Sequence, residues 1–227
     1  MQQTKSNLFL TPESYRWPLT VFLLVSSYLT AIILIGFIGY TDFLNLTPFN
    51  LLMSMTLLLW GHQPRSTGLW NYLALAYSVG FVAELIGVSS GMVFGAYEYG
   101  PVLGWKIWGT PLLIGVNWAM VVYLGNELSN RVLPKGTTAV RVLVGATIPV
   151  ALDWIIEPVA IHYNMWRWSD AVPPLHNYIG WFIISLILSY AYQRWIGFHK
   201  NRVAPLLLGL QILFFLILGL QLQTTTN

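Results

Sequence analysis

Residues 80–118 read GFVAELIGVSSGMVFGAYEYGPVLGWKIWGTPLLIGVNW, and this stretch decides the fold because two apolar segments are joined by a connection rich in glycine and aromatic residues. Glu84 lies within the first apolar segment. An ionisable group at that position is costly in a bilayer unless it faces a cavity or a polar partner. The stretch therefore predicts a membrane helix with a functional carboxylate. The structural alternative is a protonated glutamate that hydrogen-bonds between helices.

The composition predicts an integral membrane protein. Hydrophobic residues make up 56% of the 227 residues, charged residues 8%, and the mean hydropathy is +0.63. So few polar groups cannot cover a soluble surface, and we expect one all-α transmembrane domain over residues 1–227. Seven apolar windows are long enough to cross a bilayer, near residues 18–40, 43–61, 69–90, 109–128, 138–157, 176–195 and 203–222. The first is longer than the core of a signal peptide and is expected to be a retained anchor.

The cations predict the orientation of these spans. On the seven-span topology, nine of the eleven Lys and Arg residues fall on the N-terminal side of the membrane: Lys5, Arg16, Arg65, Arg131, Lys135, Arg141, Arg194, Lys200 and Arg202. Only Lys106 and Arg167 fall on the other side. The positive-inside rule then places the N-terminus in the cytoplasm and the C-terminus outside. The net charge of +3 is explained by this topology and does not indicate nucleic-acid binding.

The fifth span carries two carboxylates on one helical stripe. Residues at intervals of four form this stripe: Arg141, Gly145, Pro149, Asp153 and Glu157. Asp153 and Glu157 should therefore be neighbours, roughly 6 Å apart at Cβ. Pro149 frees the carbonyl of Gly145 and is expected to kink the helix, and Pro158 is expected to end it at Glu157. A carboxyl group beside another, at a helix end and short of water, suits a proton donor. Alternatively, two interfacial acids simply end a helix.

Acids and aromatic residues are predicted to gather on the outer face, which also receives the two long connections, 91–108 and 158–175. Glu84 should lie at a depth similar to Asp153, so that Glu84, Glu98, Asp153 and Glu157 can surround one pocket. The aromatic residues nearby exceed what an interfacial belt requires: Tyr97, Tyr99, Trp105, Trp108, Trp118, Trp154, Trp166, Trp168, Tyr178 and Trp181. Each aromatic face can stabilise a cation by about 0.5–2 kcal/mol. Acids that protonate an apolar group next to such faces indicate carbocation chemistry.

Several other membrane-protein classes do not fit. A retinal protein needs a lysine buried in a helix, and no lysine occupies such a position. The four histidines are expected to be isolated, which argues against a di-iron centre. There is no cysteine, so disulfides, thiolate metal sites and cysteine nucleophiles are excluded. Ser89 lies in a Gly-x-Ser-x-Gly pattern, but it follows a helix rather than a strand. A diphosphate site would need more carboxylates and more cations than the outer face offers.

The chain resembles the integral-membrane carotenoid biosynthesis protein family over about residues 80–182. The matching positions are Glu84, Gly87, Gly91, Phe94, Gly95, Tyr97, Tyr99, Leu103, Gly104, Pro111, Trp118, Asp153, Glu157-Pro158, Trp166-Arg167-Trp168, Pro174, Asn177 and Gly180-Trp181. Spans one, two and seven match only in hydrophobicity, and Val172-Pro173-Pro174 departs from the expected glycine before the proline. Characterised members are carotenoid 1,2-hydratases, including bisanhydrobacterioruberin hydratase and γ-carotene 1',2'-hydratase. The resemblance implies a multi-pass protein of a prokaryotic cytoplasmic membrane.

The predicted reaction adds water across the terminal C1=C2 double bond of an acyclic carotenoid. Protonation at C2 gives a tertiary cation at C1, which water captures, and no metal or other cofactor is required. Glu157 or Glu84 would be the acid and Asp153 its partner, with Glu98 as a fourth candidate. The aromatic and polar residues expected to bind the substrate or orient water are Tyr97, Tyr99, Trp118, Trp154, Trp166, Trp168, Trp181, Asn177 and His162. The polyene would lie in the lipid between spans.

Two alternatives remain open from the sequence. A carotenoid end-group cyclase begins with the same protonation but quenches the cation with an internal alkene. A proton-coupled transporter of a hydrophobic molecule would also use intramembrane carboxylates, although no repeat symmetry is evident. The expected partners are the carotenoid and membrane lipids, with other carotenoid-pathway enzymes as candidates and nucleic acid excluded. The sequence does not identify the carotenoid, the number of ends modified or the oligomeric state.

The predicted topology can be tested with reporter fusions. A reporter after Asn227 and a reporter within residues 131–137 should lie on opposite sides of the membrane, because the last three predicted spans separate the two positions. Matching signals from the two fusions would contradict the seven-span topology.

Overall fold

The computed structural model describes residues 12–225, and this part of the chain is all-α, as predicted, apart from short strands that were not predicted. Its seven α-helices fall on the seven apolar windows: α1 (Pro12–Ala31), α2 (Thr47–Trp60), α3 (Thr67–Ser90), α4 (Leu113–Val132), α5 (Thr138–His162), α6 (Leu175–Trp195) and α7 (Val203–Thr225). A π-helical segment, η1 (Ile32–Phe37), extends α1, and a 3₁₀ segment, η2 (Thr41–Leu46), leads into α2. Lys5, one of the cations used to predict the orientation, lies outside the described residues.

Five helical segments of the described chain are long and apolar enough to cross a membrane. They are Tyr15–Phe37, Thr41–Trp60, Thr67–Ser90, Thr138–His162 and Val203–Thr224. The remaining helices, α4 and α6, carry buried polar residues such as Asn126 and Gln193. These side chains face other helices rather than lipid, so lower hydropathy is compatible with a position inside a bundle. The chain is thus a multi-pass membrane protein, while seven crossings and their orientation stay predictions.

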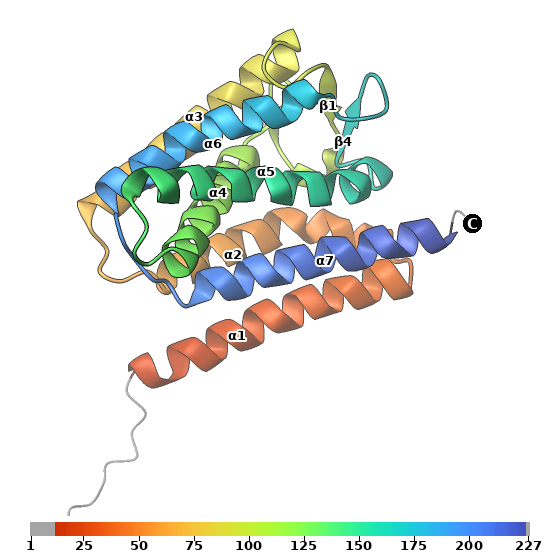
Figure 1. Cartoon of the computed structure of the whole chain (residues 1–227). Helices are drawn as coiled ribbons and strands as arrows, with labels where there is room; N and C mark the ends of the chain where they lie inside the picture. Colours follow the sequence, from red (N-terminus) through yellow and green to blue (C-terminus); the bar gives the residue numbers. More distant parts are fainter. Residues whose placement is uncertain (1–11, 226–227) are drawn as a thin grey trace, which may run out of the picture.

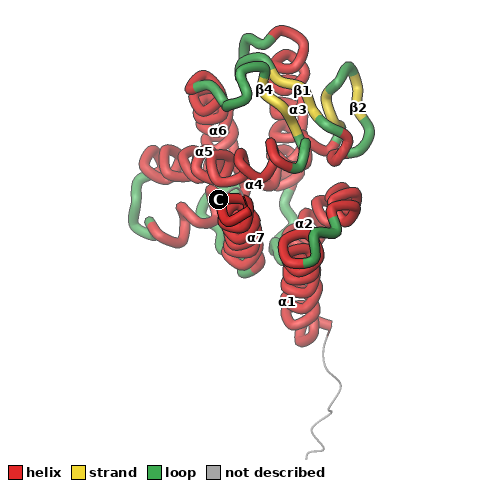
Figure 2. The backbone as a smooth tube through the Cα atoms, turned by 90° about the vertical axis from the view of Figure 1, so that its right-hand side faces the viewer, coloured by secondary structure: helices red, strands yellow, loops and turns green. Residues whose placement is uncertain are grey.

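Helix α4 lies at the centre of the bundle. Figure 1 shows α1, α2 and α7 on one side of it and α3, α5 and α6 on the other, and Figure 2 shows α4 between the two groups. It contacts α2, α3, α5, α6 and α7, and Val122, Tyr123 and Asn126 on it are completely inaccessible. The C-terminal end of α7 lies at the same end of the bundle as the β1/β4 strands (Figure 1).

Two glycines allow α4 and α5 to approach closely. Pro149 lies inside α5 and leaves the carbonyl of Gly145 without an intrahelical donor. A Cβ atom added at Gly125 of α4 would lie 2.5 Å from that carbonyl oxygen and 3.0 Å from Cδ of Pro149. The contact therefore requires glycine at position 125.

The two long connections meet in a small antiparallel sheet that the sequence analysis did not predict. Strand β1 (Tyr97–Tyr99) pairs with β4 (Trp166–Trp168), with Tyr97 opposite Trp168 and Tyr99 opposite Trp166. Two further strands of two residues each, β2 (Lys106–Ile107) and β3 (Thr110–Pro111), pair as an antiparallel hairpin. The pairing of β1 and β4 confirms that the two connections share one end of the bundle.

The expected end of the fifth helix at Glu157 is wrong. Helix α5 continues through Pro158 to His162. An internal proline costs about 3 kcal/mol in a helix, but Val159 and Ala160 beyond it are fully buried in the core. Burial of this last turn offsets the missing hydrogen bond and keeps Glu157 inside a continuous helix.

A glycine-to-alanine pair tests the α4–α5 contact. Gly125→Ala should destabilise the protein by about 1–3 kcal/mol, because the added methyl group overpacks the interface. Gly209→Ala on α7 is the matched control, since a Cβ there meets no atom within 4 Å. It should be neutral or stabilising by up to about 1 kcal/mol from helix propensity. Thermal unfolding of both variants in detergent measures the difference, and equal stabilities would contradict the close contact.

Candidate functional site

Three of the four predicted acids line one small chamber at the sheet end of the bundle. Glu84 reaches it from α3, and Asp153 and Glu157 reach it from successive turns of α5. Its volume is about 40 Å³, which exceeds the roughly 10–15 Å³ that one water molecule needs by this measure. We call this space the carboxylate chamber. Other predicted residues that line it are Tyr97, Tyr99, Trp166, Trp168, Asn177 and Trp181.

Glu84 accepts three hydrogen bonds from aromatic side chains. The hydroxyl groups of Tyr97 and Tyr99 donate to Oε2 at 2.5 and 2.7 Å, and Nε1 of Trp118 donates to Oε1 at 2.8 Å. Two glycines of α3 make room for these donors. A Cβ at Gly80 would lie 2.4 Å from the Cβ of Trp118, and one at Gly87 would lie 3.1 Å from the Tyr97 hydroxyl. Glycine at these two positions therefore leaves the space in which Trp118 and Tyr97 reach Glu84.

Glu157 and Asp153 each keep one oxygen atom free of protein donors. Nε1 of Trp166 and Nε1 of Trp168 both donate to Oε2 of Glu157 at 3.0 Å. Asn177 of α6 donates to Oδ2 of Asp153 at 2.8 Å. Within residues 12–225 no side chain or backbone group donates to the other oxygen of either carboxyl group. Both groups line the chamber, so a substrate or water there can meet these oxygens.

The β1/β4 sheet delivers the aromatic donors. Alternation along a strand sends neighbouring side chains to opposite faces, so Tyr97 and Tyr99 face the chamber while Glu98 faces away. Across the sheet the rings of Tyr97 and Trp168 lie 5.0 Å apart between centroids. Trp118 stacks on Trp181 behind this wall, with centroids 3.8 Å apart. The chamber is therefore walled largely by aromatic side chains.

Three predicted residues lie away from the chamber. Glu98 is 72% exposed and pairs with Arg167 at 3.5 Å on the outer face of the sheet. Trp154 is 67% exposed on α5. His162 is exposed and packs its ring against Tyr163. The structure does not bring these side chains to the other candidates.

Asn117 of α4 lines the chamber but was not among the predicted residues. It is a polar residue in the apolar first half of α4, and a polar group in an apolar stretch is the same signal that identified Glu84. A second missed signal is a pair of matching triplets, Tyr97-Glu98-Tyr99 and Trp166-Arg167-Trp168. In each, two aromatic residues flank one charged residue, and the two charges have opposite sign. Such complementary triplets are typical of paired strands.

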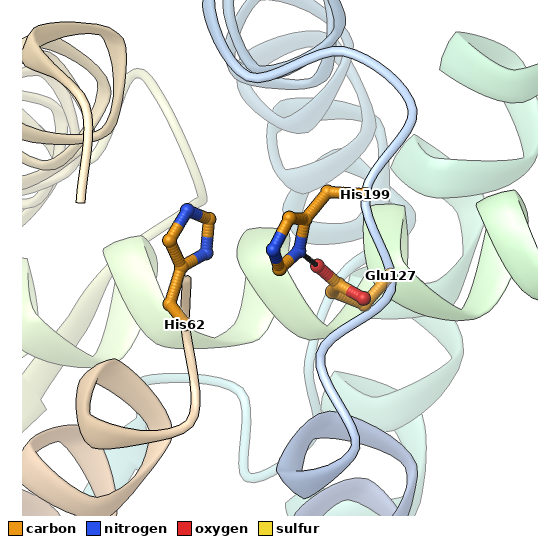
Figure 3. Close-up of side chains that lie close together, drawn as sticks. All are labelled: His62, Glu127 and His199. Carbon is orange, nitrogen blue, oxygen red and sulfur yellow. Dashed lines mark hydrogen bonds and ion pairs between the residues drawn. The ribbon is translucent and has the colours of Figure 1, made fainter. Parts of the chain in front are cut away.

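The expectation that all four histidines are isolated is wrong. His62 and His199 stack with ring centroids 4.0 Å apart and planes 18° from parallel. They belong to the α2–α3 and α6–α7 connections, which lie at the end of the bundle opposite the β1/β4 strands (Figure 1). Glu127 of α4 lies beside them (Figure 3). One ligand atom from each of the three residues lies within 4.8 Å of the others, so the group could hold a metal ion. However, stacked rings direct their nitrogen lone pairs along nearly parallel planes, and a metal needs lone pairs that converge.

The hydrogen bonds of this cluster favour an ion pair. Nδ1 of His199 lies 2.6 Å from Oε1 of Glu127, and its Nε2 lies 2.9 Å from the carbonyl oxygen of Gln63. Both partners only accept when Glu127 is ionised, so both ring nitrogens of His199 must donate and the ring is an imidazolium. The Tyr192 hydroxyl and the backbone N–H of Asn201 also donate to Glu127. The pair joins α4 to the loops before α3 and α7.

The two histidines have opposite pKa shifts. Partial burial lowers the pKa of His199, but the hydrogen bonds to Glu127 and Gln63 and the attraction of Glu127 outweigh it, so the net shift is upward. Burial, with repulsion from His199, lowers the pKa of His62 to about 4. His62 is therefore neutral at pH 7, and its Nδ1 lies 2.6 Å from the Tyr123 hydroxyl.

The ion pair predicts a pH-dependent contribution to stability. Since the pKa of His199 is higher in the folded state, its stabilisation is complete below about pH 6.5 and is lost as the pH rises through the folded value. We expect the stability deficit of His199→Gln to be larger at pH 6 than at pH 9. His62 contributes with the opposite sign, mainly below about pH 6.5, and most of this contribution is common to both proteins because burial is the main cause of its lowered pKa. Thermal unfolding at both pH values tests this, with the exposed His176→Gln as control; a deficit that does not shrink at pH 9 would refute the ion pair.

Comparison with known proteins places this arrangement in a family. The sequence model of the family described as "Carotenoid biosynthesis protein" matches residues 45–225, which extends the resemblance beyond residues 80–182 to α2 and α7. A bisanhydrobacterioruberin hydratase from Haloarcula japonica is 25% identical over 174 residues, covering 68% of this chain. The chain matches 56% of that relative's length, just over half. No solved structure matches the chain. Because the family match covers most of the sequence, including every residue that lines the carboxylate chamber, the chain belongs to the carotenoid biosynthesis protein family.

Proposed function

We propose that this protein is a hydro-lyase of carotenoid biosynthesis that adds water to the terminal C1=C2 double bond of an acyclic carotenoid end group. Family membership supports carotenoid biosynthesis, and the relative's name as a hydratase supports the reaction class. The observation that carries the proposal is the carboxylate chamber, where Asp153 and Glu157 each present an oxygen without a protein donor beside aromatic faces.

The proposed acid and base are Glu157 and Asp153. A carboxylic acid O–H of one residue transfers its proton to C2, and the π electrons of the double bond form the new C–H bond. The tertiary cation at C1 then accepts a lone pair from water, and the water's extra proton passes to a carboxylate of the pair. If the receiving carboxylate is not the group that protonated C2, one proton then passes from it to that group, and the pair is back in its starting state. No redox change occurs, and no metal or nucleotide is required.

Glu84 has a different proposed role. Three donors occupy its two oxygens, and the indole N–H of Trp118 can only donate. Asp153 and Glu157 each keep one oxygen without any protein donor, whereas both oxygens of Glu84 accept from protein groups. Glu84 therefore fits best as the residue that holds Tyr97 and Tyr99 in place, and the acid is better sought on α5.

The aromatic wall supports the cation step. Indole and phenol groups tied to carboxylates by hydrogen bonds keep their rings fixed, and a fixed face next to C1 stabilises positive charge by about 0.5–2 kcal/mol. Trp166 and Trp168 are fixed in this way by Glu157. Asn177 is tied to Asp153 and is the proposed orienting group for water.

Amide substitutions test the carboxylate mechanism. Asp153→Asn and Glu157→Gln should each lower hydration by at least about a hundredfold, because an amide of equal volume cannot deliver a proton. Glu84→Gln should also lower hydration strongly, because one amide oxygen cannot accept from Tyr97, Tyr99 and Trp118 together as the carboxylate does. The exposed Asp170→Asn on the same face is the matched control. Near wild-type rates in all three chamber variants would show that these residues are structural.

Product analysis tests the reaction class. Purified protein in detergent, with a chelator present, should convert lycopene into a product heavier by one water. In water enriched in the heavy oxygen isotope the new hydroxyl should carry the label, and in deuterated water one deuterium should appear at C2. An isomer of unchanged mass would identify a cyclase. A requirement for magnesium, a flavin or dioxygen would refute the proposed mechanism.

A further inference from the structure

A second, larger cavity adjoins the carboxylate chamber. Its volume is about 260 Å³, and it lies between α4 and α5 on one side and α1, η2, α2 and α7 on the other. Six residues line both spaces: Ile114, Asn117, Val121, Leu152, Ile156 and Trp166. Because these side chains are shared, the two spaces are neighbouring parts of one interior region. We call the larger space the apolar cavity.

The apolar cavity suits a hydrocarbon chain. Its walls are mostly aliphatic and aromatic, with Phe214 and Phe215 from α7 and Leu51 and Met53 from α2. A cavity of about 150 Å³ with such walls stays dry and takes up benzene. The apolar cavity is larger than this, and burial of apolar ligand surface there is favourable by roughly 25 cal/mol per Å².

The apolar cavity also reaches lipid-facing residues. Leu46 at the end of η2 is 50% exposed, and Phe49 on α2 is 66% exposed, yet both also line the cavity. In a bilayer these side chains face acyl chains. A long ligand can therefore lie partly inside the cavity and continue between helices into the lipid, without crossing water.

Asn117 lies where the two spaces meet. Of the six shared residues, only Asn117 and Trp166 carry a polar side-chain group, and the Trp166 N–H is used by Glu157. The Asn117 side chain makes no hydrogen bond to any other residue in the described chain. The carboxyl groups lie on the chamber side of Asn117, and most side chains on its other side are apolar, with Ser27, Asn50 and Gln211 among the exceptions.

We propose that the apolar cavity binds the polyene chain of the carotenoid, with the end group extending past Asn117 into the carboxylate chamber. This inference rests on the proposed function and deepens it. It replaces the expectation that the whole polyene lies in the lipid, because part of the chain lies inside the bundle. The cavity then selects long, apolar, extended substrates, while the chamber performs the chemistry.

The test fills the cavity without touching the chamber. Ala31 of α1 lines the apolar cavity only, and Ala31→Trp places a large side chain there. Ala74→Trp on α3 is the matched control, since Ala74 is exposed and lines neither space. Ala31→Leu is a milder second variant in case the tryptophan prevents folding, and it should give a smaller loss of the same kind.

Two substrates separate the cavity from the chemistry. Lycopene has a long polyene, and pseudoionone carries the same terminal group on a short chain. Ala31→Trp should lower kcat/KM for lycopene by at least about tenfold, the effect of losing the burial of two or more carbon atoms. It should leave any activity toward pseudoionone within about twofold, because the chamber is unchanged. Ala74→Trp should behave like the wild type with both.

A binding measurement makes the result independent of catalysis. Lycopene is achiral, so circular dichroism in its visible band appears only when a chiral site holds it. Wild type and Glu157→Gln should both induce this signal, and Ala31→Trp should lose it. A folded Ala31→Trp variant that keeps both the signal and full activity on lycopene overturns the cavity proposal while the proposed function stands. A wild type that gives the signal but no hydrated product supports the cavity and overturns the proposed function. A wild type without any induced signal overturns the cavity proposal.

Discussion

Each buried carboxyl group of the site needs hydrogen-bond donors, because little water reaches the interior of a membrane protein. The rest of the site depends on this requirement. An unpaired polar group in that setting costs several kcal/mol. Here the donors are mainly indole N–H and phenol O–H groups, which bring aromatic faces with them. Glu84 and Glu157 together recruit five such donors from α4, β1 and β4. The same contacts that satisfy the acids therefore also build the walls of the carboxylate chamber.

This requirement explains why two long connections form a sheet at one end of a helical bundle. β1 and β4 have alternating aromatic side chains, and only a paired, extended backbone presents two of them from each strand to one side. The fifth donor, Trp118, lies on α4 and packs against Gly80 of α3. The helices α3 and α5 hold the carboxyl groups, and the strands β1 and β4 hold most of the donors. Acceptors and donors are therefore both positioned by regular secondary structure.

Much of the fold could be predicted because hydropathy reports directly on bilayer length. All seven helices lie where apolar windows predicted them, and the acids at positions 84, 153 and 157 meet because α3 and α5 run toward the same end of the bundle. The end of α5 could not be predicted from Pro158, since the burial of Val159 and Ala160 depends on tertiary contacts. The His62–Glu127–His199 cluster was missed for a similar reason. Its members are separated by tens of residues, and only the folded loops bring them together.

The ion pair between Glu98 and Arg167 has a consequence for the response to ionic strength. It is the charged cross-strand pair at the centre of the β1/β4 sheet, and both side chains are more than half exposed. At molar salt the Debye length is only about 3 Å, so this attraction is largely screened. The aromatic pairs and the hydrogen bonds to Glu84 and Glu157 on the other face are shielded from dissolved ions. The register of the two strands should therefore persist from dilute buffer to brine, leaving the geometry of the chamber independent of the osmotic conditions of the cell.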